Sequence, residues 1–125
     1  MIQVQTDLKV FDNSGGKEAH CIRVLGSRKI GGIGNLAVVS LRKITKMHKR
    51  QNKKVTVGKV YRFLIIQTKK ERQRFDGSYI RFSMNGGILL NNQNQPIGSR
   101  IKCTVPVELR ELSYLKAISL GSYLV

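Results

Sequence analysis

The stretch from Lys59 to Asn91 constrains the fold of this chain most strongly. Val60 to Ile66 is rich in β-branched and aromatic residues and predicts a strand. Asp76-Gly77 follows between two β-rich runs and predicts a two-residue hairpin turn, because glycine adopts the positive φ that such a turn needs. Four cations lie between the strand and this turn: Lys69, Lys70, Arg72 and Arg74. We therefore predict a β-ribbon with its base in a core and a charged tip that projects toward a negatively charged partner.

The charge of the whole chain agrees with such a partner. The 125 residues include 23 Lys and Arg but only 7 Asp and Glu, which gives a net charge of +16 and a pI near 10.5. A balance this basic points to a polyanion, usually nucleic acid. We expect no membrane partner, because the sequence has neither an apolar span of about 20 residues nor a basic amphipathic helix.

The positive charge is concentrated in one part of the chain. From Arg42 to Arg74 there are 13 basic residues and a single acid, Glu71. A run of charges is usually only a solvated face. Here the run is nearly free of acids and is followed and interrupted by aromatic residues, and Arg and Lys side chains bind phosphates well. The basic loop and ribbon, residues 42–82, are therefore the predicted nucleic-acid interface.

The residues before the basic loop predict further short strands. We expect strands within residues 1–12, from Ala19 to Leu25 and from Leu36 to Leu41, the last buried on both faces. In the second strand, Ile22 and Val24 should share one face.

The chain after the ribbon predicts small helices in residues 105–120. Pro106 suits a first helical turn, and Ser113 could cap a second short helix. Five or more short strands followed by small helices favour a single mainly β domain, a small β-barrel with appendages, over a βαβ fold.

No catalytic or metal site is predicted, and no cofactor. Cys21, Cys103, His20 and His48 fit no zinc spacing, and the seven acids form no recognisable catalytic pair. The glycines of residues 31–34 lack the Lys-Ser/Thr helix start of a P-loop and are interpreted as a turn. We therefore expect a protein that is not an enzyme.

Segments along the whole chain resemble the universal large-subunit ribosomal protein number fourteen family, in its bacterial or organellar form. The similar segments, in order, are Met1 to Thr6, Asp12 to Gly15, Cys21 to Gly26, Gly32 to Gly34, Thr68 to Lys70, Asp76 to Phe82, Leu89 to Asn91, Gln95 to Ile101 and Glu108 to Arg110. The chain departs from the family pattern at Asn35, Lys59 and Phe75, and its loop in residues 42–57 is a few residues longer.

The resemblance implies a closed five-stranded β-barrel with a protruding β-ribbon and short C-terminal helices. It implies a structural protein of the large ribosomal subunit that binds large-subunit rRNA, helps to form a bridge to small-subunit rRNA and touches neighbouring ribosomal proteins. It also implies that a ribosomal silencing factor docks near the C-terminus. The position of three residues in the similar segments and the final helix assigns them to that docking surface: Ser99, Arg100 and Lys116. The alternative is that Arg100 contacts a neighbouring protein or rRNA.

The residues expected to contact rRNA phosphates lie in the basic loop and ribbon. They are Lys46, Lys49, Arg50, Lys53, Lys54, Lys69, Lys70, Arg72, Arg74 and Arg81. The alternative function is a free-standing barrel that binds single-stranded nucleic acid, which should carry an exposed aromatic platform on one sheet face. The chain has no Trp, and its aromatic residues lie mostly in core-like runs.

The expected location is a ribosome in a reducing compartment. The two cysteines show no disulfide spacing and no signal peptide is recognisable. No Lys or Arg precedes Lys9, unlike a transit peptide. We therefore expect an organelle-encoded protein of the mitochondrial matrix, with a plastid or the bacterial cytoplasm as alternatives.

Overall fold

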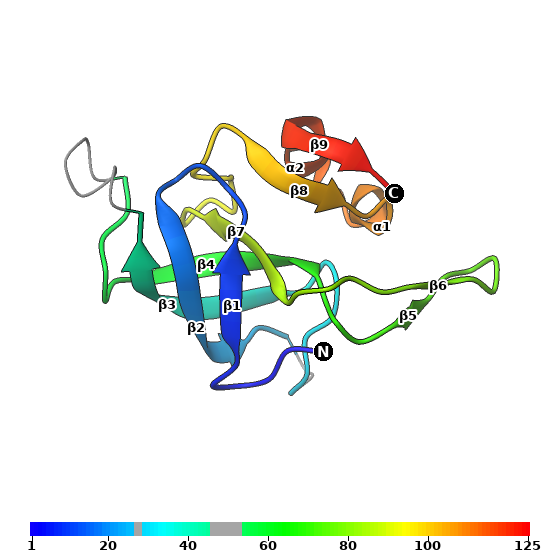
Figure 1. Ribbon diagram of the computed structural model, residues 1–125, viewed down its shortest axis with the longest axis horizontal. Helices are drawn as coiled ribbons and strands as arrows, with labels where there is room; N and C mark the ends of the chain where they lie inside the picture. Colours follow the sequence, from blue (N-terminus) through cyan, green and yellow to red (C-terminus); the bar gives the residue numbers. More distant parts are fainter. Residues whose placement is uncertain (27–28, 46–53) are drawn as a thin grey trace.

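The computed structural model, which describes residues 1–26, 29–45 and 54–125, contains a closed five-stranded barrel (Figure 1). The barrel strands are β1 (Asp7–Val10), β2 (Gly16–Val24), β3 (Leu36–Ile44), β4 (Val60–Gln67) and β7 (Gly86–Leu90). Neighbouring strands are antiparallel except β1 and β7, whose parallel pairing closes the barrel. The predicted closed five-stranded barrel is confirmed.

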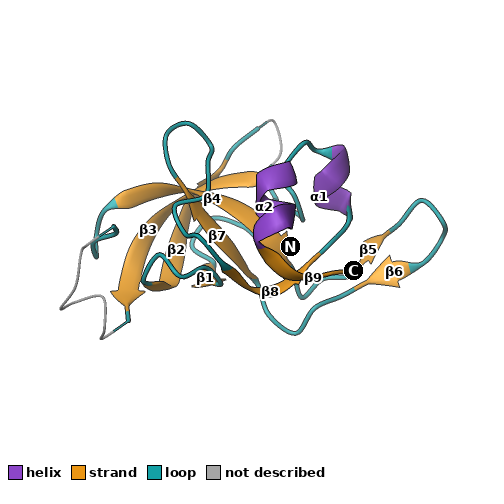
Figure 2. Cartoon of the chain, turned by 90° about the horizontal axis from the view of Figure 1, so that it is seen from above, coloured by secondary structure: helices purple, strands orange, loops and turns teal. Residues whose placement is uncertain are grey.

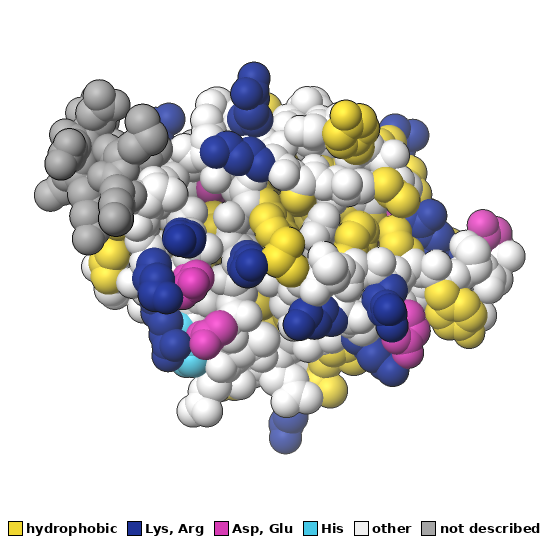
Figure 3. All heavy atoms as spheres, viewed as in Figure 1, with side chains coloured by type: hydrophobic (Ala, Val, Ile, Leu, Met, Phe, Trp, Pro, Cys, Tyr) yellow, Lys and Arg dark blue, Asp and Glu magenta, His cyan; other side chains and the backbone are white. Residues whose placement is uncertain are grey.

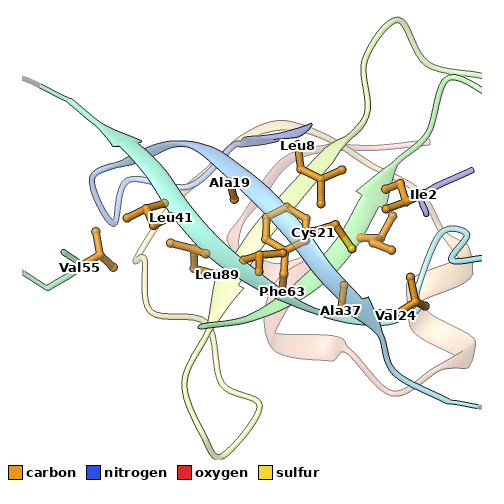
Figure 4. Packing of buried hydrophobic residues seen from close by; sticks show 12 residues of the cluster. Ile2, Leu8, Ala19, Cys21, Val24, Ala37, Leu41, Val55, Phe63 and Leu89 are labelled. Carbon is orange, nitrogen blue, oxygen red and sulfur yellow. The ribbon is translucent and has the colours of Figure 1, made fainter. Parts of the chain in front are cut away.

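Strand β4 is buried on both faces and contributes to two cores. Phe63 and Ile65 belong to the cluster inside the barrel (Figure 4), whereas Leu64 and Ile66 pack in a second cluster with the C-terminal elements. This double burial explains the continuous apolar run of β4, since each face of the strand meets a different apolar layer. The partner strand β7 approaches closely at Gly87, where a Cβ would overlap the Leu64 carbonyl.

Two expectations about the first strands are wrong. β3 is not buried on both faces: every second side chain is buried, and Leu36, Val38 and Ser40 are half-buried. In β2 the register shifts between Cys21 and Arg23, so a β-bulge separates the two residues that should share a face. As a result Val24 points into the barrel and Ile22 is 43% exposed.

The C-terminal elements pack against the barrel as a separate layer (Figure 2). β8 (Ile101–Val105) pairs in parallel with β9 (Gly121–Leu124), and α1 (Glu108–Glu111) and α2 (Leu115–Leu120) connect the two strands. The two short helices are as predicted, but β9 was not expected.

The predicted cap of the second helix is wrong. Ser113 has a φ of +64° and forms no cap; the residue before α2 is Tyr114, which makes no side-chain cap hydrogen bond.

The ribbon is formed by β5 (Arg72–Gln73) and β6 (Tyr79–Ile80), which are antiparallel and extend away from the barrel (Figure 1). Its turn has three residues rather than the predicted two. The Arg74 N–H donates to the Ser78 carbonyl at 2.8 Å, and the Gly77 N–H donates to the Arg74 carbonyl at 3.2 Å. Of the three turn residues, only Gly77 has a positive φ, which is +85°.

The side chain of Asp76 explains the longer turn. Its carboxylate accepts hydrogen bonds from the Ser78 N–H at 2.9 Å and the Ser78 hydroxyl at 2.6 Å. These bonds hold Asp76 in a turn that needs left-handed backbone at Gly77 alone, whereas a two-residue turn of the type expected for Asp-Gly needs it at both residues.

The loop after β1 connects the barrel to β8. The buried Asp12 carboxylate accepts hydrogen bonds from the Ser14 N–H at 3.1 Å, from the Ser14 hydroxyl and from the Leu89 N–H at 3.1 Å. The Asn13 amide oxygen accepts from the N–H groups of Ser99 and Arg100 at 2.8 and 3.1 Å. The polar residues of this loop therefore have a structural role.

Candidate nucleic-acid interface

A groove at the end of the barrel gathers four cations. It has a volume of about 820 Å³ and lies among the ends of β1 and β3, the start of β2 and the start of β8. Its lining includes Val10, Phe11 and the acid Asp12. The cations on its lining are Lys17, Arg42, Lys43 and Lys102. We call this surface the basic groove.

Two of these cations form exposed ion pairs. Arg42 Nη1 lies 3.1 Å from Asp7 Oδ1, and Lys43 Nζ lies 2.8 Å from Glu18 Oε2. The hydrogen bond with His20, then the charge of Arg42, hold the pKa of Asp7 below its ordinary value. Exposed pairs of this kind contribute little free energy, so a phosphate can replace the carboxylate at low cost.

Lys17 and Lys102 complete the groove and were missed from the sequence. Both are exposed, and neither forms an ion pair within the described residues. They are 85 positions apart in the chain and each stands outside the dense basic region. The Lys102 N–H donates to the Phe11 carbonyl at 2.7 Å, which brings β8 to this edge of the barrel. No local sequence signal indicates that contact.

A second group of exposed cations lies where the ribbon leaves the barrel. We call Lys69, Lys70 and Arg81 the ribbon base; all three are exposed. The Phe82 N–H donates to the Thr68 carbonyl at 3.1 Å and holds the two chain segments together there. Lys70 Nζ lies 2.6 Å from Glu71 Oε1, and this hydrogen bond lowers the pKa of Glu71.

The other two ribbon cations turn back toward the protein. Arg72 Nη1 donates to the Ile33 carbonyl at 2.8 Å. Arg74 Nε lies 2.5 Å from Glu108 Oε1, and Arg74 Nη2 donates to the main-chain oxygen of Val125 at 2.7 Å. Glu108 is only 7% exposed. These guanidinium groups attach the ribbon to the loop at Ile33 and to the C-terminal layer.

The end of the ribbon therefore differs from the charged tip expected from the sequence. Its turn presents Phe75, which is 96% exposed, and the carboxylate of Asp76. The cations lie at the ribbon base or fold back. Figure 3 shows one face of the molecule: Lys and Arg are spread over the barrel and around the start of the ribbon, and acidic side chains lie beside several of them.

The predicted residues of the basic loop lie mostly outside the described part of the chain. Lys46, Lys49, Arg50 and Lys53 fall there, whereas Lys54 is described and exposed. Phosphate contact by these residues, and by the ribbon cations, stays a prediction.

The residues predicted for partner docking are all exposed. The Ser99 hydroxyl accepts a hydrogen bond from the Asn13 amide at 2.9 Å. Lys116 on α2 lines a small cavity with Pro96, so α2 packs on the loop that leads to Ser99 and Arg100. Neither Arg100 nor Lys116 forms an ion pair within residues 1–26, 29–45 and 54–125. Their role stays a prediction.

Other kinds of site find no support in the described residues. The exposed aromatic side chains there are Phe75, Tyr79 and Tyr123, and none lies on a barrel strand. No group of three or more His, Cys, Asp or Glu side chains in these residues could hold a metal ion. No helix in this part of the chain is long and apolar enough to span a bilayer.

The comparison with known families covers every residue of the chain. A family model described as ribosomal protein L14p/L23e matches residues 1–125.

Proposed function

The chain belongs to the ribosomal protein L14p/L23e family, and we propose that it holds two RNA segments at once, one of the large subunit and one of the small subunit. The resemblance predicted from the sequence is confirmed. The family comprises structural ribosomal proteins of the large subunit rather than enzymes, so the protein is a ribosomal component that binds rRNA. The bridge to the small subunit is the proposal.

One observation supports the bridge: exposed cations gather both in the basic groove and at the ribbon base. The basic groove lies at the end of β3, and the ribbon base lies where β4 leaves the barrel (Figure 1). These two groups lie at different strand ends, so one RNA segment is not required to contact both. A rigid body with two phosphate-binding surfaces can join two RNA segments.

The chemistry of both surfaces suits the RNA backbone rather than particular bases. Lys and Arg bind phosphate oxygens, release counterions and fix position without reading sequence. We propose phosphate contacts for cations of the groove, the basic loop and the ribbon base, which are Lys17, Lys46, Lys49, Arg50, Lys53, Lys54, Lys69, Lys70, Arg81 and Lys102. Arg72 and Arg74 would have to leave their internal partners to bind a phosphate, so we expect weaker phosphate contacts from these two arginines.

The test neutralises each surface separately in assembled ribosomes. One variant carries Lys17→Gln and Lys102→Gln, a second carries Lys69→Gln and Lys70→Gln, and sedimentation measures incorporation into large subunits and joining to small subunits. One pair should reduce incorporation, and the other should reduce joining while incorporation is normal.

The matched control removes two exposed cations outside both surfaces, Arg23→Gln and Arg110→Gln. It should sediment like the parent protein. If neither lysine pair affects joining more than the control does, the bridge proposal is wrong, while rRNA binding can still be read from incorporation.

A second proposal concerns the silencing factor. Arg100 and Lys116 are exposed cations outside the basic groove and ribbon base, which an acidic partner could recognise. Large subunits with Arg100→Glu and Lys116→Glu should capture the cognate silencing factor more weakly at normal assembly. Undiminished capture would place the factor elsewhere.

A further inference from the structure

The basic groove is lined by apolar side chains as well as cations. Its volume of about 820 Å³ lies within the range of pockets that enclose organic ligands. Phe11 and Ile44 in this lining are half-buried, and Val57 is 52% exposed. Contacts with phosphates need exposed cations but no apolar hollow. The groove therefore offers space and apolar surface for a part of RNA other than its phosphates.

The fold holds this apolar lining in place. The Phe11 N–H donates to the Gly87 carbonyl at 2.9 Å. The Phe11 ring lies against Gly86, where a Cβ would come within 2.5 Å of Phe11 Cε2. Ile44 packs on the cluster inside the barrel. Side chains that packing has already fixed lose little conformational freedom when a ligand binds.

The charges around the apolar lining favour a nucleotide over an apolar protein segment. Neither Lys17 nor Lys102 forms an ion pair within the described residues, and an apolar segment would leave both without an anion. The acid in the lining, Asp12, is 6% exposed and accepts hydrogen bonds from Ser14 and Leu89. A nucleotide joins a flat base, whose faces are apolar, to charged phosphates, and thus matches both parts of the groove.

We propose that the basic groove receives one unpaired nucleotide of the RNA, with its base against Phe11, Ile44 and Val57 and the adjoining phosphates on the surrounding cations. Proteins recognise unpaired bases by stacking them on aromatic and other apolar side chains, whereas a base inside a helix is covered by its neighbours. The inference rests on the proposed function, which assigns RNA to this groove, and it adds which part of the RNA the groove selects.

The first test compares two RNA probes that differ in one unpaired base. One probe is a fully paired duplex, and the other is the same duplex with a single bulged nucleotide. The full-length protein should bind the bulged duplex about tenfold more tightly at the same salt concentration, because one base gains a stacking contact. The log–log salt slopes of the two probes should be the same within about one phosphate. Equal affinity for the two probes would overturn the inference.

Variants separate this inference from the proposed function. Val57→Asn should remove the preference for the bulged duplex and leave the salt slope unchanged, whereas the matched control Val60→Asn, 53% exposed and outside the groove lining, should keep the preference. Lys17→Gln with Lys102→Gln should lower the slope on both probes and keep the preference. A slope that the lysine pair does not change counts against the proposed RNA surface. A preference that survives Val57→Asn shows that the base lies elsewhere.

The second test identifies the occupant of the groove in assembled large subunits. Thr45, an exposed residue of the lining, is replaced by the photoreactive p-benzoylphenylalanine, and the crosslinked products are identified after irradiation. The expected product is a single unpaired rRNA nucleotide. A crosslink to a protein or to a paired nucleotide, or no crosslink at all, would contradict the inference.

Discussion

The basic groove lies between the barrel and β8, whereas the ribbon groove, lined by residues 72–76, 107, 108 and 111, lies between the ribbon and α1. Four cations and one acid line the first, and two arginines and three acids line the second. The basic groove combines cations from β2, β3 and β8. Two of these cations, Lys17 and Lys102, lie outside the densest basic stretch of the sequence. The ribbon groove lies at the end of the densest basic stretch, yet its arginines are turned inward. Density of positive charge along a chain therefore does not by itself locate the surface that binds a polyanion.

Two arginine–carboxylate pairs show why an arginine in a dense basic stretch need not be free to bind a phosphate. Arg42 and Asp7 are both more than half exposed, whereas Arg74 and Glu108 have side-chain exposures of 24% and 9%. Water already solvates the first pair, so phosphate can compete for Arg42. Glu108 is buried and depends on Arg74, so that arginine is held inside the protein.

The largest effect that this comparison predicts is on RNA binding. Replacing Lys17 and Lys102 by Gln should weaken binding to an rRNA fragment about a hundredfold in about 50 mM salt and reduce the log–log salt slope by about 1.8. Arg74→Gln should leave the slope unchanged. A salt titration measures both, and the comparison fails if the Arg74 variant changes the slope as much as one lysine does.

The next effect is on stability. Arg74→Gln leaves the Glu108 carboxylate buried without its cation and should reduce the free energy of unfolding by about 2–3 kcal/mol. Arg42→Gln, at an exposed pair, should cost at most about 0.5 kcal/mol. Denaturant unfolding of the two variants measures the difference. Equal losses would show that burial does not distinguish the pairs.

The turn that presents Phe75 gives a smaller effect. Gly77→Val places a β-branched residue at a φ of +85° and should destabilise the protein by about 1–2 kcal/mol, although no atom crowds the position. Gly77→Asn, which tolerates a positive φ, should lose less. If the Val variant melts at the same temperature as the parent protein, the positive φ at position 77 is contradicted.

The smallest effect is on the pH dependence of stability. Hydrogen bonds, from His20 to Asp7 and from Ser78 to Asp76, lower the pKa of each carboxyl from an ordinary 3.8. A lowered folded-state pKa adds stability above pH 3.8, and this contribution is lost as the pH falls through the lowered pKa. Asp7→Asn and Asp76→Asn should each flatten the acid side of the stability profile. A profile as steep as that of the parent would show that these bonds are absent in solution.

The fold was largely predictable and the candidate site was not. Apolar runs and turn residues predicted strands, small terminal helices, a ribbon and a small barrel, and the closed five-stranded form of the barrel followed from the resemblance. The bulge at Ile22 was not predictable, because its cause is the pairing with β3 rather than the local sequence. β9 was missed because it pairs in parallel with β8 across the two helices.

The surroundings of Arg74 and Lys102 could not be predicted for a similar reason. The sequence gives no indication that Glu108 packs opposite Arg74, or that β8 brings Lys102 beside the barrel cations, since both contacts join residues far apart in the chain. Residues whose role depends on local backbone, such as Asp76 and Gly77, were identified, although the length of their turn was not.

The burial of β4 on both faces also determines how the protein unfolds. Alternate residues of this strand, Phe63 and Leu64 among them, belong to different cores, so the C-terminal layer cannot detach without exposing the outer face of the barrel. Unfolding should therefore be cooperative, and the amide protons of β4 should exchange only through global opening. A protein of this kind keeps its surfaces at fixed distances from one another while it stays folded.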